Sequence, residues 1–473
     1  MEPGAETAAC APARYVTVPD APSSPAAAAA ATAAATAADP ATSGFGAVAR
    51  VAPGALAASY ADLCAAAWPG PEQLPVVYHP NYNISFFGIE KLHPFDAGKF
   101  AKVVKTLNRD GVLRSDTQLV TPREATPELL ADVHTADYLH RIHNHNFTVV
   151  QVTELAPLAM LPNKLLQWRV VAPMRMHVGG TMLAMGLALE RGWAVNVGGG
   201  MHHASADRGM GWCPFDDIVL GVRRARRAVA TAEAAAAAGA GAAAPEGAGA
   251  AAAAGAATPA GQADAAAGAP AAAAQVGGTA AAAAAFATTA AVGAAAAGGG
   301  LKVLVIDLDA HQGNGVGRDK LALGDGQLYI LDMYNGGIFP RDDEAKAAID
   351  IKVELKSGTE DDVYLNRLRA ALERAALVLP RPDLVVYNAG TDVLAGDPLG
   401  RLGVSAAGVV ERDELVWRWC RDVARAPIAM LLSGGYARDS AAVIAASLAN
   451  LFAKFDLNPG AAAAAPAAPS SGA

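Results

Sequence analysis

The chain has 473 residues, of which 53% are hydrophobic but only 6% are aromatic, because alanine and glycine dominate. The net charge of -8 gives no general attraction to nucleic acid or to an anionic membrane, so we expect direct binding to neither. The four cysteines form no CxxC pair, which fits a reducing compartment and excludes a cysteine-based zinc finger. No secretory leader or strongly apolar spanning run is found, so we expect a soluble intracellular protein.

Three segments are poor in large apolar side chains. They are residues 1–73, which are rich in Ala, Pro, Ser and Thr, residues 228–300, which contain no lysine or arginine, and the tail 458–473. Such segments cannot bury enough apolar surface to offset the entropy of ordering, so we predict that they are disordered. The remaining residues, 74–227 and 301–457, are predicted to form a single domain.

Within this domain, short apolar runs alternate with helical patterns. In chain order the sequence predicts a helix over 170–190, strands over 193–197, 303–306 and 328–331, a helix over 360–377, a strand over 384–387, a helix over 413–423, a strand over 428–432 and a helix over 440–452. Continuously apolar strands that alternate with helices predict an α/β fold, with a mostly parallel sheet flanked by helices on both faces.

Polar or glycine-rich clusters directly follow four of these strands. The clusters are GGGMHH (198–203), DLDAHQGNG (307–315), NAGTD (388–392) and SGGY (433–436). Ligands bind just beyond the carboxyl ends of the strands in open parallel sheets, so the four clusters are expected to meet at one edge. The sequence therefore predicts an active site at that edge. The insertion 228–300 connects a helix to a strand and is expected at the opposite edge.

The second cluster places Asp307, Asp309 and His311 at alternate positions. On an extended segment these side chains share one face, and carboxylate and imidazole groups are good zinc ligands. A catalytic zinc site needs a third ligand from elsewhere, and Asp392 at the end of its own strand is the best candidate. Capping of the following helix would explain one of the acids, but not three alternating polar side chains. We therefore predict a metal site.

His202 and His203 follow three glycines at the same predicted edge. This position favours a role in proton transfer over a histidine pair that is merely exposed to solvent and has no function. Four side chains are available to orient their rings: Asp207, Asp307, Asp309 and Asn314. Tyr436 could donate a hydrogen bond to a developing oxyanion, although a tyrosine packed at a strand end fits its motif equally well. A serine nucleophile is not expected without a G-x-S-x-G motif, and Cys213 is interpreted as a buried wall residue.

The ordered motifs GGGMHHASADRG, IDLDAHQGNG, YNAGTDVLAGDPLG and SGGY resemble the histone deacetylase superfamily, which has the arginase/deacetylase fold. YNISFFGIEKLHPFDAGKF and VVYNAGTDVLAGDPLGRLGVS are similar to its class IV branch. The resemblance covers nearly the whole predicted domain and neither the tails nor the insertion. It implies zinc-dependent hydrolysis of N6-acyl-lysine in histones or other proteins, with lysine and a carboxylate as products. A catalytically weak pseudo-enzyme that reads or scaffolds acylated proteins is the alternative.

The resemblance also implies roles for single residues. Asp309, His311 and Asp392 match the ligands of one zinc ion per chain, and His202 and His203 match the catalytic pair, with His203 as the base. Tyr436 matches the residue that polarises the acyl carbonyl, and Gly211, Trp212 and Phe339 match residues that line the acyl-lysine channel. Asn314 matches the partner of His203. Asp307 matches a residue that supports His202 and contributes to a structural potassium site.

Two expectations about substrate and place follow from the same resemblance. Class IV members share the asparagine at position 314 and favour long-chain acyl groups, which leaves fatty acyl-lysine open as a substrate beside acetyl-lysine. We expect acylated proteins such as histone tails as partners, and a chromatin regulator of the nucleus and cytoplasm. The Ala-, Ser- and Thr-rich start leaves a plastid or mitochondrion as the alternative. The basic run 223–227 is interpreted as a solvated helix end, with a localisation signal as the weaker alternative.

Overall fold

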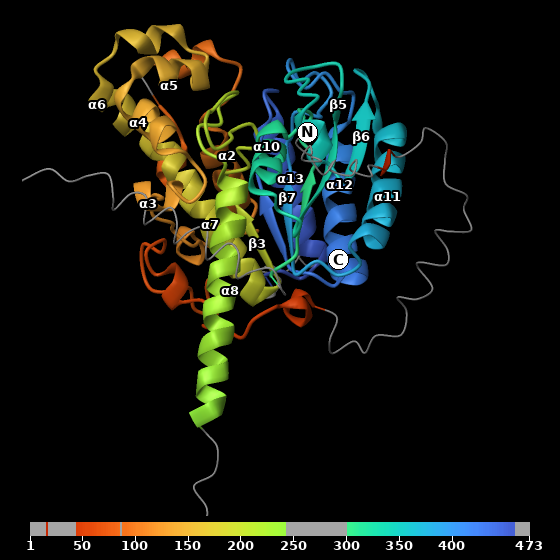
Figure 1. The fold of residues 1–473 in the computed structure, drawn as a ribbon. Coiled ribbons are helices and arrows are strands. Elements are labelled where there is room, and N and C mark those ends of the chain that lie inside the picture. The colour runs from red at the N-terminus through yellow and green to blue at the C-terminus, as the bar shows by residue number, and fades with distance from the viewer. Residues whose placement is uncertain (1–15, 18–43, 86–87, 243–299, 459–473) are drawn as a thin grey trace, which may run out of the picture. The chain divides into compact units, whose positions relative to one another are not determined.

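The computed structural model describes residues 16–17, 44–85, 88–242 and 300–458 (Figure 1). The predicted disorder of residues 243–299 and 459–473, and of most of 1–43, lies outside these ranges. Contacts divide the chain into a main unit, residues 1–231 and 301–473, and a second unit, residues 232–300. The main unit contains the sheet and the candidate site.

The sheet of the main unit has eight described strands in the order β1-β6-β5-β4-β7-β8-β3-β2, and every neighbouring pair is parallel. Their bounds are β1 (Val16–Thr17), β2 (Val76–Val77), β3 (Trp193–Asn196), β4 (Val303–Asp307), β5 (Leu328–Asn335), β6 (Ile351–Leu355), β7 (Leu384–Asn388) and β8 (Ile428–Leu431). Helices pack on both faces (Figure 1). The predicted fold class is therefore confirmed.

The longer described helices are α2 (Lys99–Arg109), α4 (Ala136–Asn144), α5 (Asn146–Thr153), α7 (Ala172–Arg191), α8 (Asp217–Ala242), α10 (Asn314–Leu323), α11 (Asp361–Val378), α12 (Ala406–Trp419) and α13 (Ser440–Lys454). Two shorter ones are α3 (Pro127–Leu130) and α6 (Asn163–Leu166). Helix α12 begins earlier than predicted because the Ser405 hydroxyl accepts a hydrogen bond from Gly408 N and caps it. Within the described ranges, no helix is both long and apolar enough to cross a membrane.

Residues 44–73 pack against the rest of the main unit, so the prediction of disorder is wrong for this stretch. Phe45, Tyr60 and Leu63 are buried, and the Phe45 ring lies 5.2 Å from that of Trp417 in α12. These large side chains are too widely spaced to make a core of their own. They are ordered because each fills a gap on the surface of a domain that already has a core.

Helix α8 does not end near Arg227, as predicted, but continues to Ala242, because alanine has the highest helix propensity. The interpretation of 223–227 as a solvated helix end is also wrong for three of its arginines. Arg224, Arg226 and Arg227 are part-buried and pair with Asp62, Asp325 and Asp132 respectively. Arg226 Nε also donates to the Leu301 carbonyl at 3.1 Å, just before β4. The chain therefore leaves and rejoins the main unit at the amino ends of the strands.

Candidate metal centre and active site

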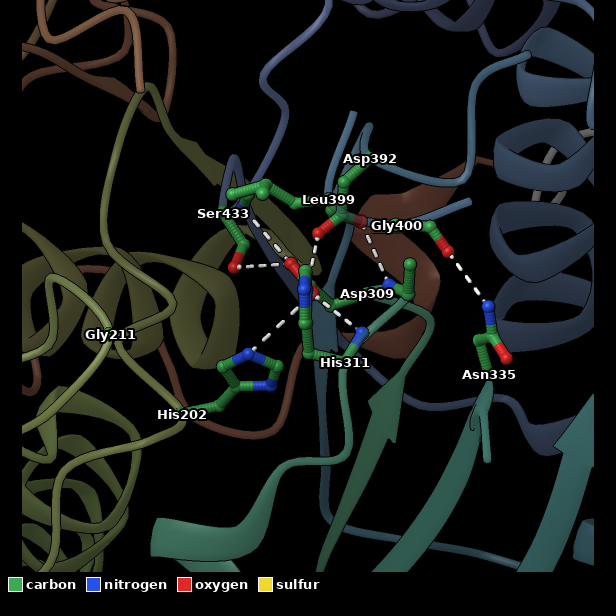
Figure 2. A network of polar contacts seen from close by, with 12 residues as sticks. His202, Gly211, Asp309, His311, Asn335, Asp392, Leu399, Gly400 and Ser433 are labelled. Carbon is green, nitrogen blue, oxygen red and sulfur yellow. Dashed lines mark hydrogen bonds and ion pairs between the residues drawn. The ribbon is translucent and has the colours of Figure 1, made fainter. Parts of the chain in front are cut away.

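The four polar clusters follow β4, β7, β8 and β3, which are consecutive neighbours in the sheet. Their side chains therefore meet at the carboxyl ends of the strands, as predicted. Figure 2 shows Asp309 and His311, which follow β4, facing Asp392, which follows β7. His202 and Ser433, which follow β3 and β8, lie beside them (Figure 2).

Asp309, His311 and Asp392 form a buried group that could hold a metal ion. A ligand atom from each lies within 4.8 Å of the others, and no second group of this kind occurs among the residues the structure describes. His311 Nδ1 lies 3.1 Å from Asp309 Oδ1 and 2.8 Å from Asp392 Oδ2. Two carboxylates and one imidazole at this spacing fit a divalent metal ion with a position left open for substrate.

The electrostatics of this group also fit a cation. Burial lowers the pKa of His311, but the hydrogen bonds and charges of Asp309 and Asp392 outweigh burial and raise the pKa to about 10. Burial, and then the charge of Asp309, raises the pKa of Asp392 to about 7. The two buried carboxylates therefore require a positive charge beside them. A divalent ion held by the three residues would supply this charge with His311 neutral.

Backbone and hydroxyl donors fix the two carboxylates in place. Asp309 Oδ2 accepts hydrogen bonds from Ser433 Oγ at 3.2 Å and Gly434 N at 3.1 Å. Asp392 Oδ1 accepts one from Ala310 N at 2.8 Å. A Cβ at position 434 would lie only 2.4 Å from Asp309 Oδ2, so the approach of this loop requires glycine. Such supporting contacts orient metal ligands before the ion arrives.

The two histidines have different partners and different charge states. His202 Nδ1 lies 2.8 Å from Asp307 Oδ2. Burial lowers the pKa of His202, but the charges of Asp307 and Asp309 outweigh it and raise the pKa to about 9. His203 Nδ1 lies 2.9 Å from Asn314 Oδ1. Burial, and then the charges of His202 and His311, lowers the pKa of His203 well below its usual range. These shifts favour the protonated form of His202 and the neutral form of His203.

Asn314 also determines which nitrogen of His203 carries the proton. Its Nδ2 donates to Asp342 Oδ2 at 3.2 Å, so its Oδ1 faces His203 and accepts from Nδ1–H. The lone pair of His203 Nε2 is then free to accept a proton. Asp207, the other acid considered for orienting the histidines, instead contacts Arg208 and Ser205 at the surface.

Tyr436 is half-buried, and its ring centroid lies 6.0 Å from that of His311. Burial raises the pKa of Tyr436 well above its usual range, so the phenol keeps its proton as a donor. Trp212 packs on Phe95 with ring centroids 5.1 Å apart, while Phe339 is 47% exposed and lies 5.1 Å from the ring of His203. The two aromatic residues and Tyr436 line a cavity of about 400 Å³ together with Gly211. A second, inner cavity of about 50 Å³ shares His203, Gly211, Trp212 and Tyr436 with the first and is also lined by His202 and Asp309.

Two buried carboxyl groups, Asp216 and Asp319, lie beside the loop that carries the histidine pair. Asp319 Oδ1 accepts a hydrogen bond from Ala206 N at 2.8 Å, and Asp216 N donates to His134 Nε2 at 3.0 Å. Burial, and then the charge of Asp319, raises the pKa of Asp216 well above its usual range. Burial also raises the pKa of Asp319 to about 6. The pair therefore favours the state in which it holds a proton over the state in which both groups are ionised.

Comparison with known proteins agrees with this geometry. The histone deacetylase domain family matches residues 93–235 and 270–452. The chain is 40% identical over 380 residues to Histone deacetylase 2 of Arabidopsis thaliana, a match that covers 80% of this chain and 79% of that protein. The chain belongs to the histone deacetylase family. The predicted superfamily is thus confirmed.

More distant similarities extend beyond named histone deacetylases. This family member is 27% identical to an uncharacterized protein of Picosynechococcus over 77% of this chain and 93% of that protein. It is 23% identical to the acetoin utilization protein AcuC of Bacillus subtilis over 70% of this chain and 68% of that protein.

Two buried residues of this deacetylase site were not predicted from the sequence. Lys99 is fully buried, and its Nζ donates to the carbonyls of Ser433 at 2.5 Å and Gly434 at 2.7 Å. It lies on the buried face of α2, and a lysine among the apolar positions of an amphipathic helix is a signal that could have identified it. Asp397 accepts hydrogen bonds from the backbone of the loop that carries Tyr436. Its only sequence signal is its place in a turn.

Proposed function

We propose that this histone deacetylase family member is a zinc-dependent lysine deacylase that hydrolyses N6-acetyl-lysine in proteins. One observation carries the proposal: the buried Asp309–His311–Asp392 group lies beside the histidine pair, and both His203 and His311 line a cavity of about 400 Å³. A carboxylate-and-imidazole ligand set with an open position supports zinc as the ion. When bound there, zinc supplies Lewis acidity to the amide carbonyl and to water.

The chain's own residues account for the proton transfers. Neutral His203 accepts the proton of the attacking water at Nε2, and the water oxygen bonds to the acyl carbon. The Tyr436 hydroxyl donates to the developing oxyanion. The carbon–nitrogen bond then breaks as His203 returns its proton to the lysine amine, which leaves a carboxylate and free lysine. Cationic His202, held by Asp307, adds positive charge near the oxyanion.

The cavity volumes bear on acyl-chain length. The inner cavity of about 50 Å³ has room for a few waters or a two-carbon product. This supports acetyl-lysine as the substrate that fits without rearrangement. A long fatty acyl chain would need the inner cavity to open, by movement of lining residues such as Met174 and Phe100. Fatty acyl-lysine therefore remains the second substrate of the proposal.

We also propose a structural potassium ion beside Asp307. Asp332 is buried next to it, and its Oδ1 has no hydrogen-bond donor. Burial, and then the charge of Asp307, raises the pKa of Asp332 well above its usual range. A monovalent cation between the two carboxylates would offset both effects. As substrates we propose acylated proteins of the nucleus and cytoplasm.

The test uses the full chain loaded with zinc and two matched peptides, one with acetyl-lysine and one with myristoyl-lysine. We expect hydrolysis of the acetyl peptide, and a loss of about 10²–10⁴ in turnover for His203→Ala. His140→Ala, in a surface helix, serves as the control and should keep wild-type turnover. A zinc-loaded protein that binds both peptides but hydrolyses neither would support a reader or scaffold instead.

A further inference from the structure

Six residues other than glycine have a left-handed backbone conformation in the described ranges, and four of them line the outer cavity. The four are Glu154, Trp212, Arg341 and Arg401, with φ between 55° and 63°. This conformation is unfavourable for residues with a side chain and persists where the surrounding structure enforces it, most often at binding sites. The mouth of the cavity is therefore a preformed surface rather than a set of loose loops.

Hydrogen bonds join the two loops that carry the arginines. Asn335 at the end of β5 donates from Nδ2 to the Gly400 carbonyl at 3.0 Å, as Figure 2 shows. Its Oδ1 accepts from Gly337 N at 3.0 Å. The Arg401 carbonyl accepts from Gly358 N at 2.8 Å. Arg341 and Arg401 thus belong to one connected part of the rim.

The two arginines are exposed, and within the described chain neither pairs with a carboxylate. Arg341 donates only to the Gly337 carbonyl, which leaves its charge uncompensated. By contrast, nearby Arg318 pairs with Asp342 and Glu344. Elsewhere on the rim, Glu154 lies 3.7 Å from His93 Nε2. The rim therefore has a basic part formed by the two arginines and an acidic part at Glu154.

We propose that Arg341 and Arg401 bind acidic side chains that flank the acyl-lysine, so that the enzyme prefers acidic sequences around its target to sequences rich in lysine and arginine. The proposal rests on the proposed function, which places the acyl-lysine in this cavity. Residues on either side of an inserted lysine must cross the rim. Two unpaired guanidinium groups there attract a carboxylate and repel another cation. The chain as a whole carries a charge of -8, so the attraction is local to the mouth.

The experiment compares three acetyl-lysine peptides with acidic, neutral or basic flanking residues on the full zinc-loaded chain. The readout is the ratio of kcat/KM between acidic and neutral peptides, which cancels effects common to both. Arg341→Asn and Arg401→Asn should each lower this ratio by about 1.4- to 5-fold, the worth of one exposed ion pair. Asparagine tolerates the left-handed conformation, so the backbone should not change. High salt should lower the ratio in the wild type.

Arg425→Asn is the matched control, because Arg425 is also exposed and left-handed, with a φ of 49°, but lies just before β8 at the opposite edge of the sheet. It should keep the wild-type ratio. The dissociation constants of the same peptides are measured in parallel on the zinc-loaded His203→Ala variant. Equal kcat/KM values of the wild type for the three peptides, together with equal dissociation constants on His203→Ala, would overturn the proposal. A ratio that stays at the wild-type value in both Arg341→Asn and Arg401→Asn would also overturn it. A charge preference in binding without any hydrolysis would support the rim and refute the proposed function.

Discussion

Asp397 joins two loops of the site through four backbone hydrogen bonds. Its Oδ2 accepts from Tyr436 N at 2.7 Å and Ala437 N at 2.9 Å. Its Oδ1 accepts from Leu399 N and Gly400 N, both at 3.0 Å. The substitution Asp397→Asn keeps the shape of the side chain but replaces one acceptor oxygen by an N–H donor. Two of the four backbone groups then lose their acceptor, whichever way the amide is oriented.

A hydrogen bond to a charged group is worth about 1.5–3 kcal/mol, so losing two costs about 3–6 kcal/mol if the loops stay in place. This cost is large enough for one loop to move. If the loop of Tyr436 moves, the oxyanion loses its donor, which lowers kcat by about 10²–10³. The metal ligands make no hydrogen bond to Asp397, so zinc content should stay at the wild-type level.

The assay measures kcat, thermal unfolding and zinc content for Asp397→Asn and for Asp383→Asn. The control Asp383 also accepts a backbone hydrogen bond, from Lys302 N at 2.8 Å, but lies at the amino ends of the strands. We expect Asp383→Asn to affect stability and leave kcat unchanged. The reasoning is refuted if Asp397→Asn keeps kcat within about 3-fold of wild type, or if both variants lower kcat equally.

Three further predictions follow from the same contacts. Tyr436→Phe should lower kcat by about 10²–10³ with zinc content unchanged, as measured by steady-state kinetics and elemental analysis. Asp216→Asn should raise the free energy of unfolding at pH 8 by on the order of 1–3 kcal/mol and have little effect at pH 4. The reason is that Asp216 and Asp319 have raised pKa values in the folded protein, so the stability that they contribute is lost as the pH rises from about 4 through 6 and above. Denaturant titrations at both pH values check this, and equal effects at the two would contradict it. Replacing residues 232–299 by a short Gly/Ser linker should keep zinc binding and kcat near wild type. The reason is that the two ends of the main unit are joined by the contact of Arg226 with Leu301 and lie at the edge of the sheet opposite the site. A large loss of activity would count against this.

The sequence predicted the positions of the metal group and five of the eight described strands, β3, β4, β5, β7 and β8, because both depend on local patterns. It did not predict β1 and β2, which have two residues each, or β6, whose buried positions alternate with less buried ones. A continuously apolar run marks a buried parallel strand, and the polar cluster after it marks the edge where Asp309, His311 and Asp392 meet. The starts of helices were less well predicted. The sequence pattern predicts α12 from residue 413, whereas the Ser405 cap starts the helix at Ala406.

What the sequence could not predict depends on contacts between distant segments. The order in residues 44–73 comes from packing on helices such as α12, and no local pattern of the segment reveals it. The roles of Lys99 and Asp397 arise from hydrogen bonds to backbone groups far along the chain, which can be made by any residue brought close enough. The left-handed conformations at the cavity mouth are likewise set by the surrounding loops, since arginine itself disfavours them.

The most direct test of the central claim is to remove and restore the metal. The full chain is stripped with a chelator, and hydrolysis of an acetyl-lysine peptide is followed as zinc is added back, for the wild type and for Asp392→Asn. We predict that the stripped protein is inactive and that the wild type regains full activity at about one zinc per chain, while Asp392→Asn binds zinc weakly and recovers little. Full hydrolysis by the stripped wild-type protein, with no zinc detected by elemental analysis, would contradict the account.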